Sequence, residues 1–77
     1  MTDKEYEFQE LLLKIGLKVS YYRKLNGLSQ QELAEKIGKS LGYIGMIEAP
    51  GVNKGMSIRT LFDIAEVLGV PIINFFE

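Results

Sequence analysis

The 77-residue sequence contains no cysteine, no histidine and no tryptophan, and it has only two prolines. Without cysteine there can be no disulfide bond, and without cysteine or histidine we expect no structural zinc site and no bound metal. The same absences remove the imidazole and thiol groups that most often serve as catalytic bases and nucleophiles. The carboxylates are not grouped at catalytic spacing either, so we expect no enzymatic activity and no small-molecule cofactor.

Long hydrophobic runs are also missing. No apolar stretch approaches the roughly 20 residues of a membrane-spanning helix, and residues 1–5 are acidic, without the pattern of a signal peptide. We therefore expect a cytoplasmic protein without membrane association. Because 47% of the residues are hydrophobic, the chain should form a single packed domain over residues 1–77.

The charges are unevenly distributed although the net charge is only −1. Residues 14–59 contain eight basic and three acidic residues, whereas residues 1–10 contain four acidic residues and one basic residue. Since the field at a surface depends on local charge, the central segment can attract phosphate groups despite the acidic total. Ordinary solvated helix faces would give the same pattern, so charge alone leaves both interpretations open.

Apolar residues recur three and four positions apart, which predicts helices and excludes strands. We expect an all-α fold with helices from about residue 4 to Asn26, over 30–37, over 41–48 and from Ser57 to Leu68. A short fifth helix should begin at Pro71. The core positions expected in the first, fourth and fifth helices are Phe8, Leu11, Leu12, Ile15, Val19 and Tyr22; Ile58, Leu61, Phe62, Ala65 and Leu68; and Ile72, Phe75 and Phe76.

A second apolar row, Leu13, Leu17 and Tyr21, lies on a different face of the first helix. We expect the C-terminal helix to cover part of this row. The alternative is that the row is a surface for a partner, because exposed apolar patches commonly mark interfaces.

The segment 30–48 has the pattern of two short helices joined by a tight turn. Ser29 and Glu32 match a capping box at the start of the first of these helices. Gly38 tolerates the left-handed conformation that ends a helix, and Ala34 is small enough for two helices to cross closely. With Ile44 and Ile47 facing inward, this is a helix-turn-helix, whose second helix normally enters the DNA major groove.

The sequence from Ile15 to Phe76 resembles the Xre/Cro/lambda-repressor class of helix-turn-helix proteins. The matching residues include Arg23, the run from Gly27 to Ala34, Ser40, Tyr43-Ile44, Ile47-Glu48, Thr60-Leu61, Leu68-Gly69-Val70 and Asn74-Phe75-Phe76. The resemblance implies a compact five-helix, lambda-repressor-like DNA-binding domain, with residues 1–13 as an N-terminal extension of the first helix. It also implies a structural ion pair in which Arg23 holds Glu48.

Double-stranded DNA is the partner that this resemblance implies. The residues expected to contact phosphates are Gln30, Lys39, Ser40, Tyr43, Asn53 and Lys54, and those expected to face the bases are Leu41, Gly42, Gly45 and Met46. The base-facing set departs from the family, which usually has polar residues there, because none of its side chains can form bidentate hydrogen bonds with a base. Leu41 and Met46 can contact thymine methyl groups, and the two glycines would allow close backbone approach. Gln30 and Ser40 can alternatively act only as helix caps, and Lys54 can simply be exposed to solvent.

We therefore expect a sequence-specific transcriptional regulator that binds DNA as a homodimer, since one short helix covers only about half a turn of duplex. The expected dimer surface is the C-terminal region around Ile72, Ile73 and Phe76, with the Leu13–Leu17–Tyr21 row as the competing surface. The apolar recognition helix leaves an alternative open: a helix-turn-helix module used mainly for protein contact, antitoxin-like or scaffold, with weak or no DNA binding. General nonspecific DNA binding is a third possibility.

Overall fold

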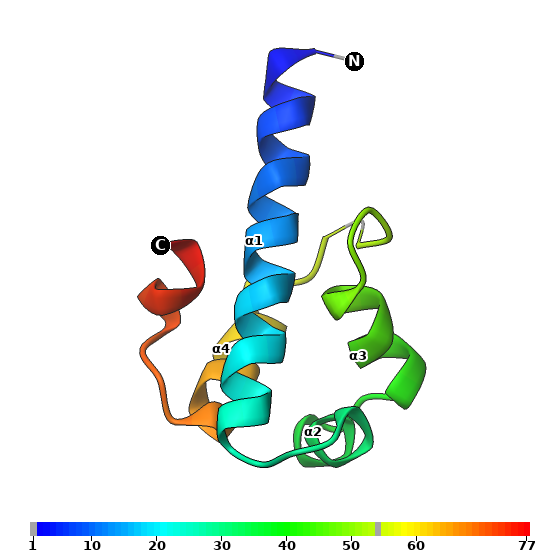
Figure 1. Cartoon of the computed structure of the whole chain (residues 1–77), viewed down its shortest axis with the longest axis vertical. Coiled ribbons are helices and arrows are strands. Elements are labelled where there is room, and N and C mark those ends of the chain that lie inside the picture. The colour runs from blue at the N-terminus through cyan, green and yellow to red at the C-terminus, as the bar shows by residue number, and fades with distance from the viewer. Residues whose placement is uncertain (1, 54) are drawn as a thin grey trace.

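The computed structural model describes residues 2–53 and 55–77, and over these residues the fold is all-α. The elements are α1 (Asp3–Leu25), α2 (Gln30–Ile37), α3 (Leu41–Glu48), α4 (Ile58–Leu68) and the 3-10 helix η1 (Ile72–Phe76). Figure 1 shows α1 running along the molecule, with the other elements gathered around its C-terminal half and its first turns extending beyond them. The expected order of five helical elements is confirmed, except that the fifth is a 3-10 helix rather than an α-helix. None of the helices in the described ranges is both long enough and apolar enough to span a bilayer.

Hydroxyl side chains begin all four α-helices. The side-chain oxygens of Thr2, Ser29, Ser40 and Ser57 each accept a hydrogen bond from the backbone N–H three residues later, at 3.0–3.1 Å. The capping box predicted at Ser29 is present, because the Glu32 carboxylate in turn accepts from the Ser29 N–H at 2.8 Å. Each such cap stabilises a helix by about 1 kcal/mol, which is why the predicted starts of α2, α3 and α4 are correct.

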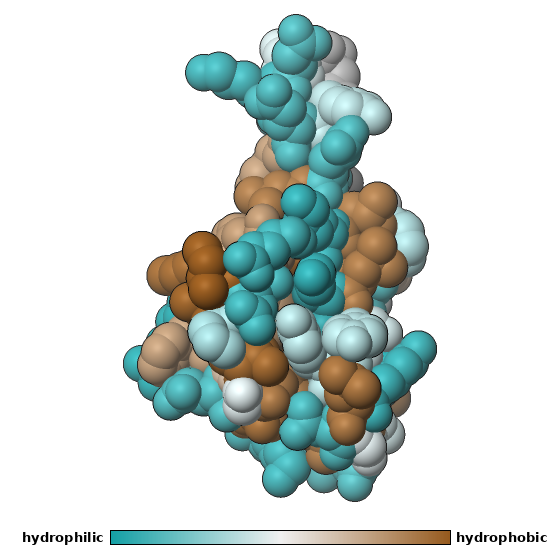
Figure 2. Space-filling view, turned by 60° about the vertical axis from the view of Figure 1, so that its left-hand side comes forward, coloured by the Kyte–Doolittle hydropathy of each residue, from teal (hydrophilic) through white to brown (hydrophobic). Residues whose placement is uncertain are grey.

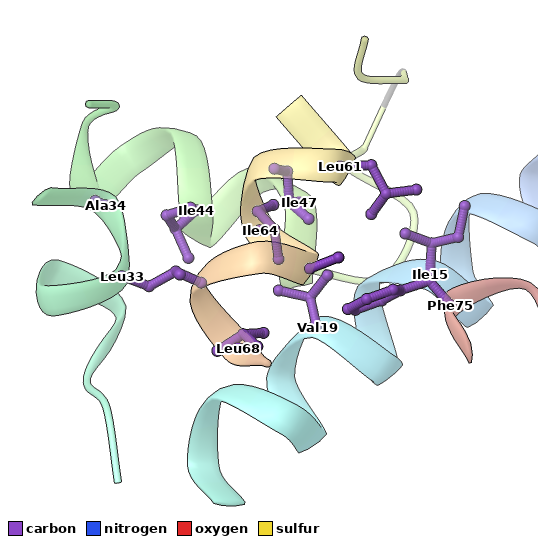
Figure 3. Packing of buried hydrophobic residues seen from close by; sticks show 11 residues of the cluster. Ile15, Val19, Leu33, Ala34, Ile44, Ile47, Leu61, Ile64, Leu68 and Phe75 are labelled. Atoms are coloured by element: carbon purple, nitrogen blue, oxygen red, sulfur yellow. The ribbon is translucent and has the colours of Figure 1, made fainter. Parts of the chain in front are cut away.

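The core lies where α1 crosses the helix-turn-helix and α4. Its fully buried side chains come from every element: Val19, Leu33, Ile44, Ile47, Ile64 and Phe75. Figure 3 shows these side chains pointing toward one another between the ribbons. Because both buried residues of α3 point into this cluster, the opposite side of α3 must face outward.

Some expected core positions are wrong. Ile58 and Phe62 of α4 are 69% and 47% exposed, while Thr60 and Ile64 are buried instead. Leu61, Ala65 and Leu68 are buried as expected, so the buried stripe of α4 is only turned toward Thr60 and Ile64. Apolar spacing alone cannot resolve this difference in a helix this hydrophobic. Phe8 is also exposed, because it precedes Leu12, the first buried residue of α1, and in η1 only Phe75 is buried, so the expected burial of Phe76 is wrong as well.

The second apolar row of α1 is not covered, contrary to expectation. Leu13, Leu17 and Tyr21 are 40%, 55% and 57% exposed. The C-terminal element instead packs beside the row, where the rings of Tyr22 and Phe75 meet edge to face at 5.5 Å.

Close backbone approach fixes α3 against α1. A side chain at Gly16 would overlap the carbonyl oxygen of Ile47. Glycine is therefore required by the crossing of the two helices, and this contact sets how deeply α3 sits in the fold.

Candidate nucleic-acid interface

The turn between α2 and α3 is as short as the sequence predicts. Gly38 ends α2 with φ +72°, in the left-handed region, and the Lys39 N–H donates to the carbonyl oxygen of Ala34 at 2.9 Å. Ser40 then caps α3 directly. The two helices are thus joined by three residues and form one rigid unit whose buried sides share the core.

The C-terminal end of α3 is held by a nearly buried ion pair. The Arg23 guanidinium donates through Nε to Oε2 of Glu48 at 2.7 Å and through Nη2 to Oε1 at 2.9 Å. Its Nη1 donates to the carbonyl oxygen of Leu28 at 2.7 Å. The predicted Arg23–Glu48 pair is therefore confirmed, and the same guanidinium also ties down the connection between α1 and α2.

These contacts shift the acidity of both partners. Burial acts to raise the pKa of the Glu48 carboxyl, but the hydrogen bonds from Arg23 and Gln30 outweigh it, so this pKa lies below its ordinary value of 4.5. The pKa of Arg23 shifts in the opposite direction: its hydrogen bond to Glu48 raises it above the ordinary value. The pair is therefore charged at neutral pH and acts as a fixed clamp on α3.

Gln30 has a role that the sequence did not reveal. Its Nε2 donates to Oε1 of Glu48 at 3.0 Å, which links the start of α2 to the end of α3. A side-chain amide carries two N–H donors, so one remains for a second acceptor. No local pattern marks this bond, because the two residues are 18 positions apart and meet only through the packing of the two helices.

Three of the expected phosphate-binding residues gather at the N-terminus of α3. The Lys39 ammonium is exposed and lies 5.3 Å from the centre of the Tyr43 ring. The Ser40 oxygen accepts from the Tyr43 N–H at 3.1 Å, which leaves its hydroxyl hydrogen available as a donor. The N-terminus of α3 thus combines the Lys39 cation, the hydroxyl groups of Ser40 and Tyr43 and the positive end of the helix dipole. Such a combination favours binding of an anion.

Asn53, one of the two expected loop contacts, is buried and does not join this group. Asn53 is only 4% exposed, and its Oδ1 accepts from the Gly55 N–H at 2.8 Å. Asn53 therefore organises the loop and does not present its amide to a ligand, which corrects its expected role as a phosphate contact. Lys54, the other expected loop contact, lies outside the described residues.

The expected base-facing residues of α3 are exposed to different extents. Leu41 is 48% exposed, while Met46 is half-buried against the edge of the core. The nearest atoms to a side chain built at Gly42 or Gly45 are Ser40 Oγ at 4.0 Å and Gln30 Oε1 at 3.9 Å. Packing within the chain therefore leaves room for side chains at both glycines.

Comparisons with known proteins agree with this architecture. A helix-turn-helix family model matches residues 19–75. The chain is 39% identical over 59 residues to an uncharacterized HTH-type transcriptional regulator of Methanocaldococcus jannaschii, covering 77% of this chain and 86% of the relative. It is 31% identical over 72 residues to the control protein C.SmaI of Serratia marcescens, covering 94% of this chain and 83% of the relative.

Two solved structures, of a master regulator and of a controller protein, also resemble this fold. The crystal structure of SinR, a master regulator for biofilm formation, in complex with DNA has a TM-score of 0.75 and 35% identity, over 82% of this chain and 98% of that one. The restriction-modification controller C.AhdI from Aeromonas hydrophila has a TM-score of 0.76 and 28% identity, over 84% of this chain and 96% of that one. These comparisons confirm the lambda-repressor-like fold and a regulatory rather than enzymatic role. The chain belongs to the Xre/Cro-type helix-turn-helix family of DNA-binding transcriptional regulators.

Proposed function

We propose that this regulator binds a near-palindromic DNA site as a homodimer, with α3 of each copy in the major groove. The observation that carries the proposal is the fixed α2–turn–α3 unit, clamped through Arg23, Gln30 and Glu48, with the N-terminus of α3 facing outward. The SinR structure, solved with DNA, supports the same use of this fold. Two half-sites about 34 Å apart would give useful affinity from two short recognition helices.

Phosphates are the groups that the N-terminal ends of α2 and α3 suit best. Lys39, Ser40 and Tyr43 lie at the start of α3, and Gln30 at the start of α2 keeps one N–H donor beyond its bond to Glu48. These contacts fix position and orientation on the duplex but do not read sequence.

Base recognition would then fall to apolar contacts and to DNA shape. Leu41 and Met46 can meet thymine methyl groups, and the lack of a side chain at Gly42 and Gly45 allows the backbone of α3 to approach the groove floor. Because no bidentate donor is present, the shape and deformability of the site would supply part of the selectivity.

The experiment starts with selection of a binding site from random duplexes, followed by titrations in increasing salt. Lys39→Ala should weaken binding about equally on selected and random DNA and flatten the salt slope by roughly one unit. Met46→Ala should instead relax the preference at one A·T pair and leave nonspecific binding nearly unchanged. The charge-matched control is Lys4→Ala, because Lys4 is exposed at the distant start of α1.

Each outcome decides a part of the proposal. Equal losses on selected and random DNA for Met46→Ala would refute the readout by α3 side chains. A complete lack of binding at low salt would refute DNA binding and support the second candidate function, a module for protein contact. The observation that favours this second function is the exposed apolar surface of Leu41 and of the α1 row.

A further inference from the structure

The outer face of α1 carries an apolar row without a partner in the described part of the chain. Tyr6, Leu13, Leu17 and Tyr21 are 60%, 40%, 55% and 57% exposed and line one open groove of about 800 Å³. Spacings of seven, four and four residues keep them on one side of the helix. In Figure 2, which shows one side of the molecule, hydrophobic surface is broken by a band of hydrophilic atoms, and the protruding end is mainly hydrophilic.

The charges on this helix are separated along its length. The N-terminal half holds Asp3, Glu5, Glu7 and Glu10 with Lys4 as the exception, and the C-terminal half holds Lys14, Lys18 and Lys24 beside the paired Arg23. The helix dipole favours acids in the first turn and bases in the last. It does not account for Glu7, Glu10, Lys14 and Lys18, because the effect of the dipole fades within one turn of each end.

We propose that a second copy of this chain docks on this face, with its α1 antiparallel and Leu17 on the two-fold axis. In that register Leu13 lies beside Tyr21 of the second copy, and Glu10 lies beside Lys24 of the second copy. Glu10 and Lys24 share the face of Leu17, being seven residues before and after it. The apolar centre is thus flanked by two opposite-charge pairs, while Lys14 and Lys18, which also line the groove, face Ser20 and Gly16 of the second copy. Parallel helices would instead oppose Glu10 to Glu10 and Lys24 to Lys24.

The same register also determines what the protruding start of α1 lies beside in the dimer. Residues 3–10 extend beyond the other elements (Figure 1) and are mostly exposed. In the antiparallel pair, residues 9 and 10 lie beside residues 25 and 24 of the second copy, and residues 3–8 extend past the C-terminal end of its α1 toward residues 26–31. This places the dimer interface on α1 and not on the expected C-terminal surface. The inference rests on the proposed function only because both require two copies of the chain.

A disulfide assay tests the register without DNA. The chain has no cysteine, so Leu17→Cys places one thiol per chain, and two such thiols should meet across the axis and oxidise to a disulfide-linked dimer. Leu13→Cys alone should not cross-link, but Leu13→Cys mixed with Tyr21→Cys should. Ile73→Cys is the control, because Ile73 is equally exposed, at 58%, but lies on η1.

Charge reversal tests the pairing in solution by sedimentation equilibrium. Glu10→Lys and Lys24→Glu should each raise the dimer dissociation constant about 10-fold by opposing like charges. The double variant should recover most of the loss, because it restores both pairs with their signs exchanged. Leu17→Glu should raise the dissociation constant about 100-fold, because it places two carboxylates at the apolar centre.

The results separate this inference from DNA binding. A monomer at high micromolar concentration, faster cross-linking of Ile73→Cys than of Leu17→Cys, or no recovery in the double charge variant would overturn it. If the Leu17→Cys dimer forms while DNA binding is absent, α1 pairing stands and the proposed function falls. If DNA binding persists in a chain that shows none of the cross-links, DNA binding stands and the pairing through α1 falls.

Discussion

Removing the Arg23 side chain should destabilise the fold by about 3 kcal/mol, because it breaks one partner of a nearly buried ion pair. Arg23→Ala removes three hydrogen bonds of 2.7, 2.7 and 2.9 Å and leaves the Glu48 carboxylate with Gln30 as its partner. In a domain whose total stability is about 5–10 kcal/mol, that loss should lower Tm by roughly 15 °C. Urea titration and thermal unfolding followed by circular dichroism measure both quantities.

The pH dependence of this loss is more diagnostic than its size. In the parent, the pKa of Glu48 is lowered, so its contribution to stability is complete above its ordinary value of 4.5 and is lost as pH falls through the folded-state pKa. In Arg23→Ala, burial without the guanidinium should raise the Glu48 pKa, so that acidification neutralises the carboxylate and relieves its cost. The difference in unfolding free energy between parent and variant should therefore shrink as pH falls from 7 toward about 4.

A second arginine in the chain provides the matched control. Arg59 donates to Asp63 at 3.0 Å, but its side chain is 80% exposed. Arg59→Ala should cost no more than about 0.5 kcal/mol, because solvent screens exposed pairs. Equal losses for the two arginines, or an Arg23→Ala loss that is independent of pH, would refute the view of Arg23 and Glu48 as a buried clamp.

Three further substitutions test separate parts of the fold. Gly16→Ala should destabilise by about 2–3 kcal/mol in urea titration, because its methyl group would overlap the carbonyl oxygen of Ile47 and force α1 from α3; an unchanged midpoint would contradict this. Gly45→Ala, the same change in open helix, should stabilise by up to about 1 kcal/mol while weakening DNA binding if α3 approaches the groove floor. Asn26→Ala should cost about 1 kcal/mol, because Nδ2 donates to the carbonyl oxygen of Leu68 at 3.1 Å and joins α1 to α4; a neutral result would show that bond to be replaceable by water.

Local features of this fold were predictable from the sequence. Ser29, Gly38 and Ser40 determine where α2 begins and ends and where α3 begins through contacts within four residues, so their roles can be read directly. The Arg23–Glu48 pair spans 25 positions and was expected only because the sequence resembles a known family.

The remaining features depend on how the helices pack. The bond from Gln30 to Glu48 and the burial of Asn53 arise only when separate elements meet. The exposure of Ile58 and Phe62 follows because the buried stripe of α4 is turned toward Thr60 and Ile64, which apolar spacing cannot distinguish. The open row on α1 belongs to the same class, because a sequence does not say which of two apolar faces its own chain will cover.

The contacts that hold α3 in place are separate from the positions it exposes. Its anchors are the buried Ile44 and Ile47, the Glu48 clamp and the crossing at Gly16. Its outer positions include Gly42 and Gly45, where an added Cβ would meet no atom closer than 3.9 Å. Changes at those outer positions can therefore accumulate without a matching loss of stability. Arginine or glutamine introduced there would add base-reading donors while also favouring the helix. Such a scaffold can be retargeted to new operators, by evolution or by design, one exposed position at a time.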